Sequence, residues 1–285
     1  MTGMERINLR NCELVADGHV HLYPSVAVEA LLDAAGRNLS ALRAQSSAEP
    51  WAGVVIADPQ GVNGYERLLR YGHASSTRGR PPWVQDGGGD CSVVFRGASG
   101  LRLLVIRGQQ LITREGLEVL GAGYTNCIPS GLTLASTVER ISAAGGWSTL
   151  AWGVAKWWGK RGRLVTDFIT AEGGRPGILL GDNGGRPWWW TRVPQFELAA
   201  ERGMRILAGT DPLPLRGEEA RVGSYGFRIE VDRAGRQPVT DALRDALENP
   251  RMEVTTIGRR VGAGRFVSNQ LGLRLNRLYR KNAFA

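Results

Sequence analysis

The chain has 285 residues, of which 42% are hydrophobic and 22% are charged, and this composition excludes a chain that is disordered throughout. No apolar run approaches the ~18 residues that a membrane-spanning helix needs, and the first residues lack the apolar segment of a secretion signal. The three cysteines form no CxxC pair, which disfavours a disulfide scaffold and a cysteine-ligated zinc site. We therefore expect a cytoplasmic protein, of unknown oligomeric state.

The formal net charge of +9 favours anionic partners, such as phosphorylated substrates, nucleic acid or a membrane surface. Only three of the 36 basic residues are lysines, at Lys156, Lys160 and Lys281, and the chain has three histidines. Because arginine is the usual basic residue here, the positions of the lysines and histidines carry more information than the net charge.

The first part of the chain is predicted to alternate between strands and helices. In chain order, its elements are a strand at 13–22, a helix at 25–44, a strand at 52–58 and a helix at 62–71. A polar, Gly- and Pro-rich loop is expected at 73–90. The strands that follow, at 91–96 and 101–107, are joined by the turn GASG and are expected to form a hairpin.

The second part of the chain continues the same alternation. Its predicted elements, in chain order, are a helix at 133–144, a strand at 147–153, a helix at 161–172, a strand at 177–182, a helix at 193–203, a strand at 205–211 and a helix at 239–248. Repeated strand–helix units are typical of a parallel sheet with helices outside it.

Seven or eight such strands over this length predict an α/β fold of the (β/α)8 TIM-like barrel type, distorted by the inserted hairpin. An open doubly wound sheet is the alternative. We expect a single barrel domain over residues 1–263 and a basic C-terminal tail over 264–285.

The first predicted strand ends in Asp17-Gly18-His19-Val20-His21. Residues i and i+2 of a strand share a face, so the imidazoles of His19 and His21 are expected to point the same way and to form a metal site. The last buried strand ends in Gly209-Thr210-Asp211-Pro212, which places a carboxylate at a strand tip. The alternative interpretations are two solvated or hydrogen-bonded histidines and an aspartate that caps a turn.

HxH at the end of the first strand and a GTDxP-like element at the end of the last resemble the amidohydrolase superfamily of metal-dependent hydrolases. The resemblance implies a (β/α)8 barrel that binds one or two divalent metals and hydrolyses amides or esters. It also implies that His19, His21 and Asp211 are metal ligands. Asp211 would in addition be the catalytic general base.

The chain departs from this family in one respect, because it has no histidine after His73, whereas the family supplies further histidines from its middle strands. Carboxylates are the expected replacements. Asp182, at the end of the strand at 177–182, is the expected fourth metal ligand, with Asp58 and Glu115 as further candidates. Such a site suits Zn, Mn or Fe as the divalent metal.

Four cations fall within residues 156–163, ahead of a predicted helix, and two of them are Lys156 and Lys160. We expect both lysines to bind the anionic part of a small substrate, together with Asn183 and Arg186, which follow a predicted strand. The alternative is a solvated basic loop. Three consecutive tryptophans, at 188–190, cannot all be buried on one face, so at least one is expected to line a cleft or to contact a partner.

Three functions are compatible with these features. The leading one is a metal-dependent hydrolase of the amidohydrolase type, which acts on an amide, lactone or ester of a small anionic substrate. The second is a catalytically degenerate barrel that binds a ligand or a protein. The third is nucleic-acid or membrane-surface binding. We rank it last and expect no nucleic-acid partner, because the basic residues are dispersed along the chain.

Overall fold

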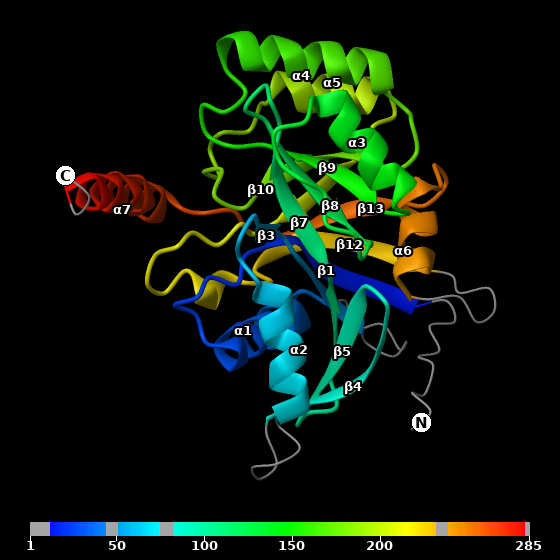
Figure 1. Cartoon of the computed structure of the whole chain (residues 1–285), viewed down its shortest axis with the longest axis vertical. Helices are drawn as coiled ribbons and strands as arrows, with labels where there is room; N and C mark the ends of the chain where they lie inside the picture. The colour runs from blue at the N-terminus through cyan, green and yellow to red at the C-terminus, as the bar shows by residue number, and fades with distance from the viewer. Residues whose placement is uncertain (1–11, 44–50, 75–81, 232–238, 283–285) are drawn as a thin grey trace.

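The computed structural model describes residues 12–43, 51–74, 82–231 and 239–282, which form a mixed α/β fold with two mixed sheets (Figure 1). The first sheet contains, in spatial order, β13 (Val254–Gly258), β12 (Tyr225–Val231), β1 (Cys12–Val20), β2 (Trp51–Ile56), β6 (Arg102–Ile106), β5 (Ser92–Gly97) and β4 (Trp83–Gly89). The second contains, in spatial order, β11 (Ile206–Gly209), β10 (Ile178–Asn183), β9 (Trp147–Ala151), β8 (Glu118–Ala122), β7 (Gly108–Ile112) and β3 (Asp58–Pro59).

The expected eight-stranded parallel barrel is not confirmed, because neither sheet closes on itself within the described residues. Parallel pairing is present in β1–β2–β6 and in β9–β10–β11. Antiparallel pairs interrupt it: β7 with β8, β8 with β9, and β12 with both β1 and β13. The part of the prediction that holds is a mixed α/β fold, in which parallel strands form the centre of the first sheet and one end of the second.

A first hydrophobic core fills the space between the two sheets. Leu14 and Ala16 of β1 point into it, together with Leu207 of β11 and Phe227 of β12. Val15, between the first two residues, packs instead on the opposite face of the sheet. This alternation follows from the two-residue period of a strand, and burial on both faces explains why Leu14, Val15 and Ala16 form a continuous apolar run.

Helices cover the outer face of each sheet and produce two further cores. The first sheet is covered by α1 (Val28–Leu42) and α2 (Gly64–Ala74), and the second by α3 (Leu134–Ala143), α4 (Gly159–Glu172) and α5 (Pro194–Glu201). The remaining helices are α6 (Val239–Glu248), α7 (Ala263–Asn282) and the 3-10 turn η1 (Glu219–Arg221). No helix in the described ranges is both long and apolar enough to cross a membrane.

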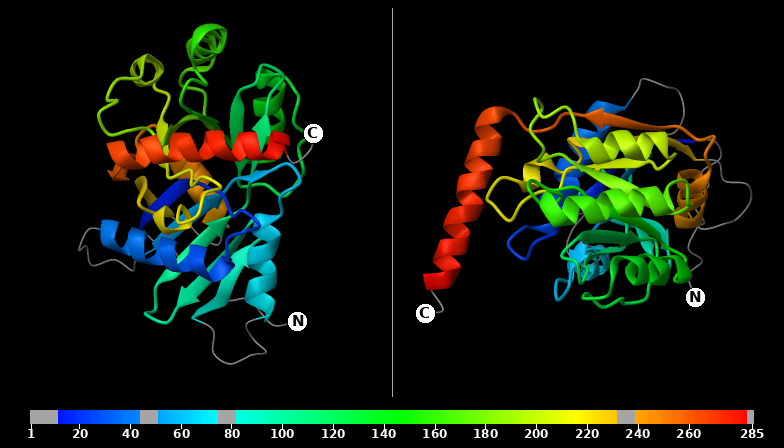
Figure 2. Two further views of the ribbon diagram at one scale, coloured as in Figure 1. Left: turned by 90° about the vertical axis from the view of Figure 1, so that its left-hand side faces the viewer. Right: turned by 90° about the horizontal axis from the view of Figure 1, so that it is seen from above.

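The predicted hairpin of residues 91–96 and 101–107 is confirmed by the antiparallel pair β5–β6. The predicted loop at 73–90 is wrong in part, because it contains β4, which extends this hairpin to three strands. The expected tail at 264–285 is helical up to Asn282, and its last three residues lie outside the described ranges. Figure 2 shows α7 as a long helix on one side of the molecule, outside the layers of the sheets.

Candidate metal centre

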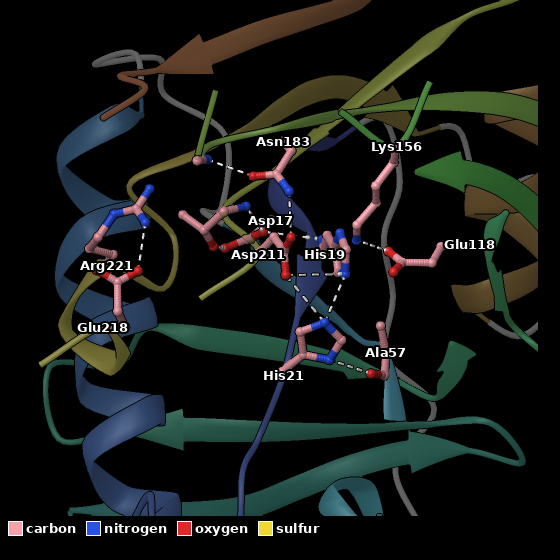
Figure 3. A network of polar contacts seen from close by, with 12 residues as sticks. Asp17, His19, His21, Ala57, Glu118, Lys156, Asn183, Asp211, Glu218 and Arg221 are labelled. Atoms are coloured by element: carbon pink, nitrogen blue, oxygen red, sulfur yellow. Dashed lines mark hydrogen bonds and ion pairs between the residues drawn. The ribbon is translucent and has the colours of Figure 1, made fainter. Parts of the chain in front are cut away.

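The two histidines of the HxH motif lie at the end of β1 with their rings in contact. Their Nε2 atoms are 3.0 Å apart, and the ring planes are close to perpendicular, at 72° (Figure 3). The Nδ1 of His21 donates to the carbonyl oxygen of Ala57 at 2.6 Å. Because a carbonyl only accepts, this bond places the proton of neutral His21 on Nδ1 and leaves a lone pair on its Nε2. The tautomer is the one that a metal ligand needs.

Asp211, the second residue after β11, places its carboxylate beside the two imidazoles. Its Oδ1 lies 3.3 Å from the Nε2 of His21 and 3.6 Å from the Nε2 of His19. Its Oδ2 accepts a hydrogen bond from Asn183, at the end of β10. The backbone of Asp211 has φ of 46°, a left-handed conformation that costs a non-glycine residue about 1–3 kcal/mol. A hydrogen bond from its N–H to the carbonyl of His19, at 2.8 Å, holds it there.

The three ligand atoms have the spacing of neighbours around one metal ion. Zn–N and Zn–O bonds are about 2.1 Å long, so adjacent ligands are about 3.0 Å apart at right angles and about 3.4 Å apart in a tetrahedron. The observed separations of 3.0, 3.3 and 3.6 Å bracket these values. His19, His21 and Asp211 therefore fit a divalent ion as a facial set of two nitrogens and one oxygen.

The protonation states of these groups also suit a metal. Burial lowers the pKa of His19 to about 4, although the charge of Asp211 opposes the shift, so the imidazole is neutral at neutral pH. Burial raises the pKa of Asp211, but the interactions with His19 and His21 outweigh this effect and hold the pKa well below its usual range. A neutral imidazole and an ionised carboxylate are the forms that coordinate metals.

A buried carboxylate that the sequence analysis did not select, Asp17, positions this group. It accepts hydrogen bonds from the N–H and the hydroxyl of Thr210, from the N–H of Gly223 at 2.8 Å and from the N–H of His19 at 3.2 Å. These bonds join β1 to the segments after β11 and before β12. Burial raises the pKa of Asp17 to about 6 against the lowering effect of the four bonds. Its place two residues before the HxH motif was the available signal.

A cavity of about 300 Å³ opens beside the candidate metal centre, and His21 and Asp211 line it. Lys156 lines the same cavity from the loop after β9, and its Nζ lies 2.5 Å from the Oε2 of Glu118. Glu118, at the start of β8, is a second residue that the sequence analysis did not select. Asn183 also lines the cavity, and α7 closes one side of it through Phe266 and other residues of its first turns.

Asp182 and Arg186 occupy different places from those expected. Both are buried and bind each other, because the Nε of Arg186 donates to the Oδ1 of Asp182 at 2.8 Å and its Nη2 lies 2.5 Å from Oδ2. The hydroxyl of Tyr225 donates to the same Oδ2 at 2.6 Å. The oxygens of Asp182 are thus engaged by three donor groups from two residues. We therefore leave Asp182 out of the ligand set and Arg186 out of the substrate-binding residues.

The remaining expected residues are not part of the cluster of His19, His21 and Asp211. Lys160 is exposed in the first turn of α4 and is not among the residues that line the cavity. Asp58 accepts from the N–H of Tyr65 at the start of α2, at 2.9 Å. Glu115 accepts from the N–H of Leu134 at the start of α3, at 3.0 Å. Asp58 and Glu115 therefore satisfy helix N-termini.

No family model and no curated protein sequence matches the chain. Among solved structures, it is similar to PsfC from Pseudomonas syringae PB-5123, with a TM-score of 0.54 and 11% identity over 96% of this chain and 99% of that one. It is also similar to PfuEndoQ from Pyrococcus furiosus, described as a lesion-specific endonuclease, with a TM-score of 0.49 and 12% identity over 85% of this chain and 58% of that one.

A third similar structure is an Endonuclease Q complex with a 27-mer duplex substrate, with a TM-score of 0.45 and 12% identity over 83% of this chain and 56% of that one. The duplex in this structure contradicts our expectation that nucleic acid is not a partner, and we do not retain that expectation. The chain spans little more than half the length of either endonuclease chain. At these identities the likeness concerns the fold, and the substrates are properties of those proteins.

Proposed function

We propose that this chain is a metal-dependent hydrolase in which His19, His21 and Asp211 hold one divalent ion. The observation that carries the proposal is the convergence of their three ligand atoms at separations of 3.0 to 3.6 Å beside an open cavity. A divalent ion bound there would polarise the scissile group and lower the pKa of a coordinated water towards 7. Two imidazoles and one carboxylate suit Zn, Mn or Fe.

The residues around the ion have separate tasks in this proposal. Asp211 lines the cavity and accepts the proton of the attacking water, while Asn183 fixes the direction of its carboxylate. Lys156 lies on the cavity wall and binds an anionic group of the substrate. To do so, its ammonium must exchange Glu118 for that group. The substrate is an ester or amide that carries a negative charge, and a phosphodiester of nucleic acid is one such ester.

Metal analysis tests the proposal directly. Protein purified without a histidine tag should contain about one equivalent of divalent metal. His19→Ala and His21→Ala should each lose it without unfolding. His73→Ala is the matched control, because His73 is the only other histidine in the chain, and it should keep the metal. Full metal content in both His19→Ala and His21→Ala would place any metal site elsewhere and overturn the proposal.

Hydrolysis is then screened with nitrophenyl esters of phosphate, phosphodiester and acetate and with a short oligonucleotide. Activity should be lost in EDTA and restored by one of the three metals. Activity that EDTA leaves unchanged would contradict a metal-dependent reaction even if metal is bound.

A further inference from the structure

A second cavity lies next to that of the candidate metal centre, and its wall is built from indole rings. Its volume is about 300 Å³, within the range of small-ligand pockets. Its lining includes Trp152, Trp157, Trp158, Trp190 and Gln195. We call it the indole cavity. Trp152 also lines the metal-centre cavity, so one indole forms a wall of both.

The rings of the indole cavity leave an aromatic face open to solvent. Trp158 is 60% exposed, and its ring is tilted by 37° from that of Trp190, with ring centroids 6.1 Å apart. Trp190 in turn meets Trp152 edge to face, at 5.4 Å, which fixes its orientation. Two tilted indoles, one of them exposed and one held, form a platform on which a planar ring can stack.

The polar groups of residues that line the same cavity indicate what kind of ring fits. Trp157 is 4% exposed, and its indole Nε1 has no hydrogen-bond partner among the described residues. A buried indole N–H normally finds an acceptor, because an unpaired donor in the interior costs about 1–3 kcal/mol. The side-chain amide of Gln195 adds polar atoms to the same wall. The Trp157 Nε1 has almost no exposed surface, so a ligand acceptor reaches it only if the indole shifts. The amide of Gln195 can pair with polar atoms on the edge of a heterocycle, whereas a hydrocarbon ring offers none.

We propose that the indole cavity binds a planar nitrogen heterocycle of the nucleobase type, which is part of the substrate of the metal centre. The heterocycle stacks on Trp158 and Trp190, and polar atoms on its edge pair with the side-chain amide of Gln195. Because Trp152 separates the two cavities, the ring and the bond to be hydrolysed occupy neighbouring sites. The assignment to the substrate depends on the proposed function, but the binding of the ring does not require the metal.

Equilibrium binding of free nucleosides to EDTA-treated protein tests the ring site without the metal. Adenosine, guanosine, cytidine and thymidine are titrated by calorimetry, with ribose and benzyl alcohol as probes for the sugar and for a ring without acceptor atoms. At least one nucleoside should bind saturably, more tightly than ribose and benzyl alcohol. Trp158→Ala should weaken this binding by about 5- to 150-fold, the loss expected for one stacking contact.

Trp188→Ala is the matched control, because Trp188 is 62% exposed and is not among the residues that line either cavity. It should bind nucleosides as the wild type does. Gln195→Leu keeps the approximate size of the side chain and removes its amide, so it should reduce the preference for the nucleoside over benzyl alcohol. Three results would overturn the inference: no saturable nucleoside binding, equal losses in Trp158→Ala and Trp188→Ala, or benzyl alcohol binding as tightly as the best nucleoside. Loss of metal binding alone would overturn the proposed function and leave the ring site standing.

Discussion

The buried carboxylate of Asp17 gives the sharpest test of how the metal centre is held. In Asp17→Ala, four donors lose their acceptor, and three of them are backbone N–H groups, on His19, Thr210 and Gly223. In Asp17→Asn, the side chain keeps one acceptor oxygen, which serves two of the four donors. Neither variant carries the buried charge. The pair therefore separates the effect of the hydrogen bonds from the effect of burying a charge.

The magnitudes follow from the contacts. An unpaired buried donor costs about 1–3 kcal/mol, so three orphaned N–H groups cost Asp17→Ala about 3–9 kcal/mol. Removing the charge offsets about 3 kcal/mol of this at neutral pH, because burial raises the pKa of Asp17 from 3.8 to about 6. The net loss is about 0–6 kcal/mol. Asp17→Asn gains the same offset and keeps acceptors for two donors, so it should be more stable than Asp17→Ala by about 2–6 kcal/mol.

Denaturant unfolding at several pH values measures both quantities. A carboxyl group with a raised pKa takes up a proton on folding, so its contribution is fully present below pH 3.8 and is lost as the pH rises to about 6. The stability of the wild type relative to Asp17→Asn should therefore fall by about 3 kcal/mol across this range. Equal stability of the two variants, or a difference from wild type that does not change with pH, would refute the reasoning. Metal affinity in Asp17→Ala should fall about 10- to 100-fold, as for other outer-shell partners.

Three further predictions concern the groups around the cavity. Asp211→Asn should lower the hydrolysis rate by about 10²–10⁴-fold with the fold intact, and near-normal turnover would reduce Asp211 to a turn residue. Lys156→Met should weaken the binding free energy of inorganic phosphate as an inhibitor by about 1–3 kcal/mol. Glu118→Gln frees the ammonium of Lys156 and should strengthen this inhibition. Unchanged inhibition in both variants would show that the ion pair is only structural. Burial raises the pKa of Glu218, but Arg221 and the other donors to its carboxylate outweigh burial and hold the pKa below 4.5. The hydrogen bonds that Glu218 accepts from α7 should therefore weaken as the pH falls below 4.5 and the carboxylate takes up a proton. Proteolysis within α7 should then accelerate at acid pH in the wild type and already be fast at neutral pH in Glu218→Gln.

Local patterns predicted most elements because local physics decides them. The helix predicted at 239–248 is α6, and the strand predicted at 177–182 is β10 with a shift of one residue. The HxH spacing was sufficient to place two imidazoles on one face, because the strand period is fixed. The segment LITREGLEVL was not assigned to any element. Gly116, with φ of 75°, turns it into the hairpin β7–β8.

Contacts between distant segments could not be predicted in this way. Asp182 ends a buried strand, as a metal ligand would, but Tyr225, 43 residues later, donates to it. Nothing in the local sequence marked Glu118 as a site residue, because its partner Lys156 is 38 residues away along the chain and only the fold brings the two side chains together. The closure of a barrel is likewise a long-range property. Repeated strand–helix units predict parallel neighbours, but they do not predict that β12 and β13 add to the first sheet in antiparallel pairs.

The candidate centre exists because two strands from different sheets approach without side chains between them. A Cβ on Gly209 would lie 2.4 Å from the backbone N of His19, and one on Gly18 would lie 2.8 Å from the carbonyl oxygen of Ala208. With glycine at both positions, the N–H of Asp211 reaches the carbonyl of His19 at 2.8 Å. The glycines of the DGHVH and GTDP motifs are thus as necessary as the ligands. They set the distance between the sheets at which two imidazoles and a carboxylate can share one ion.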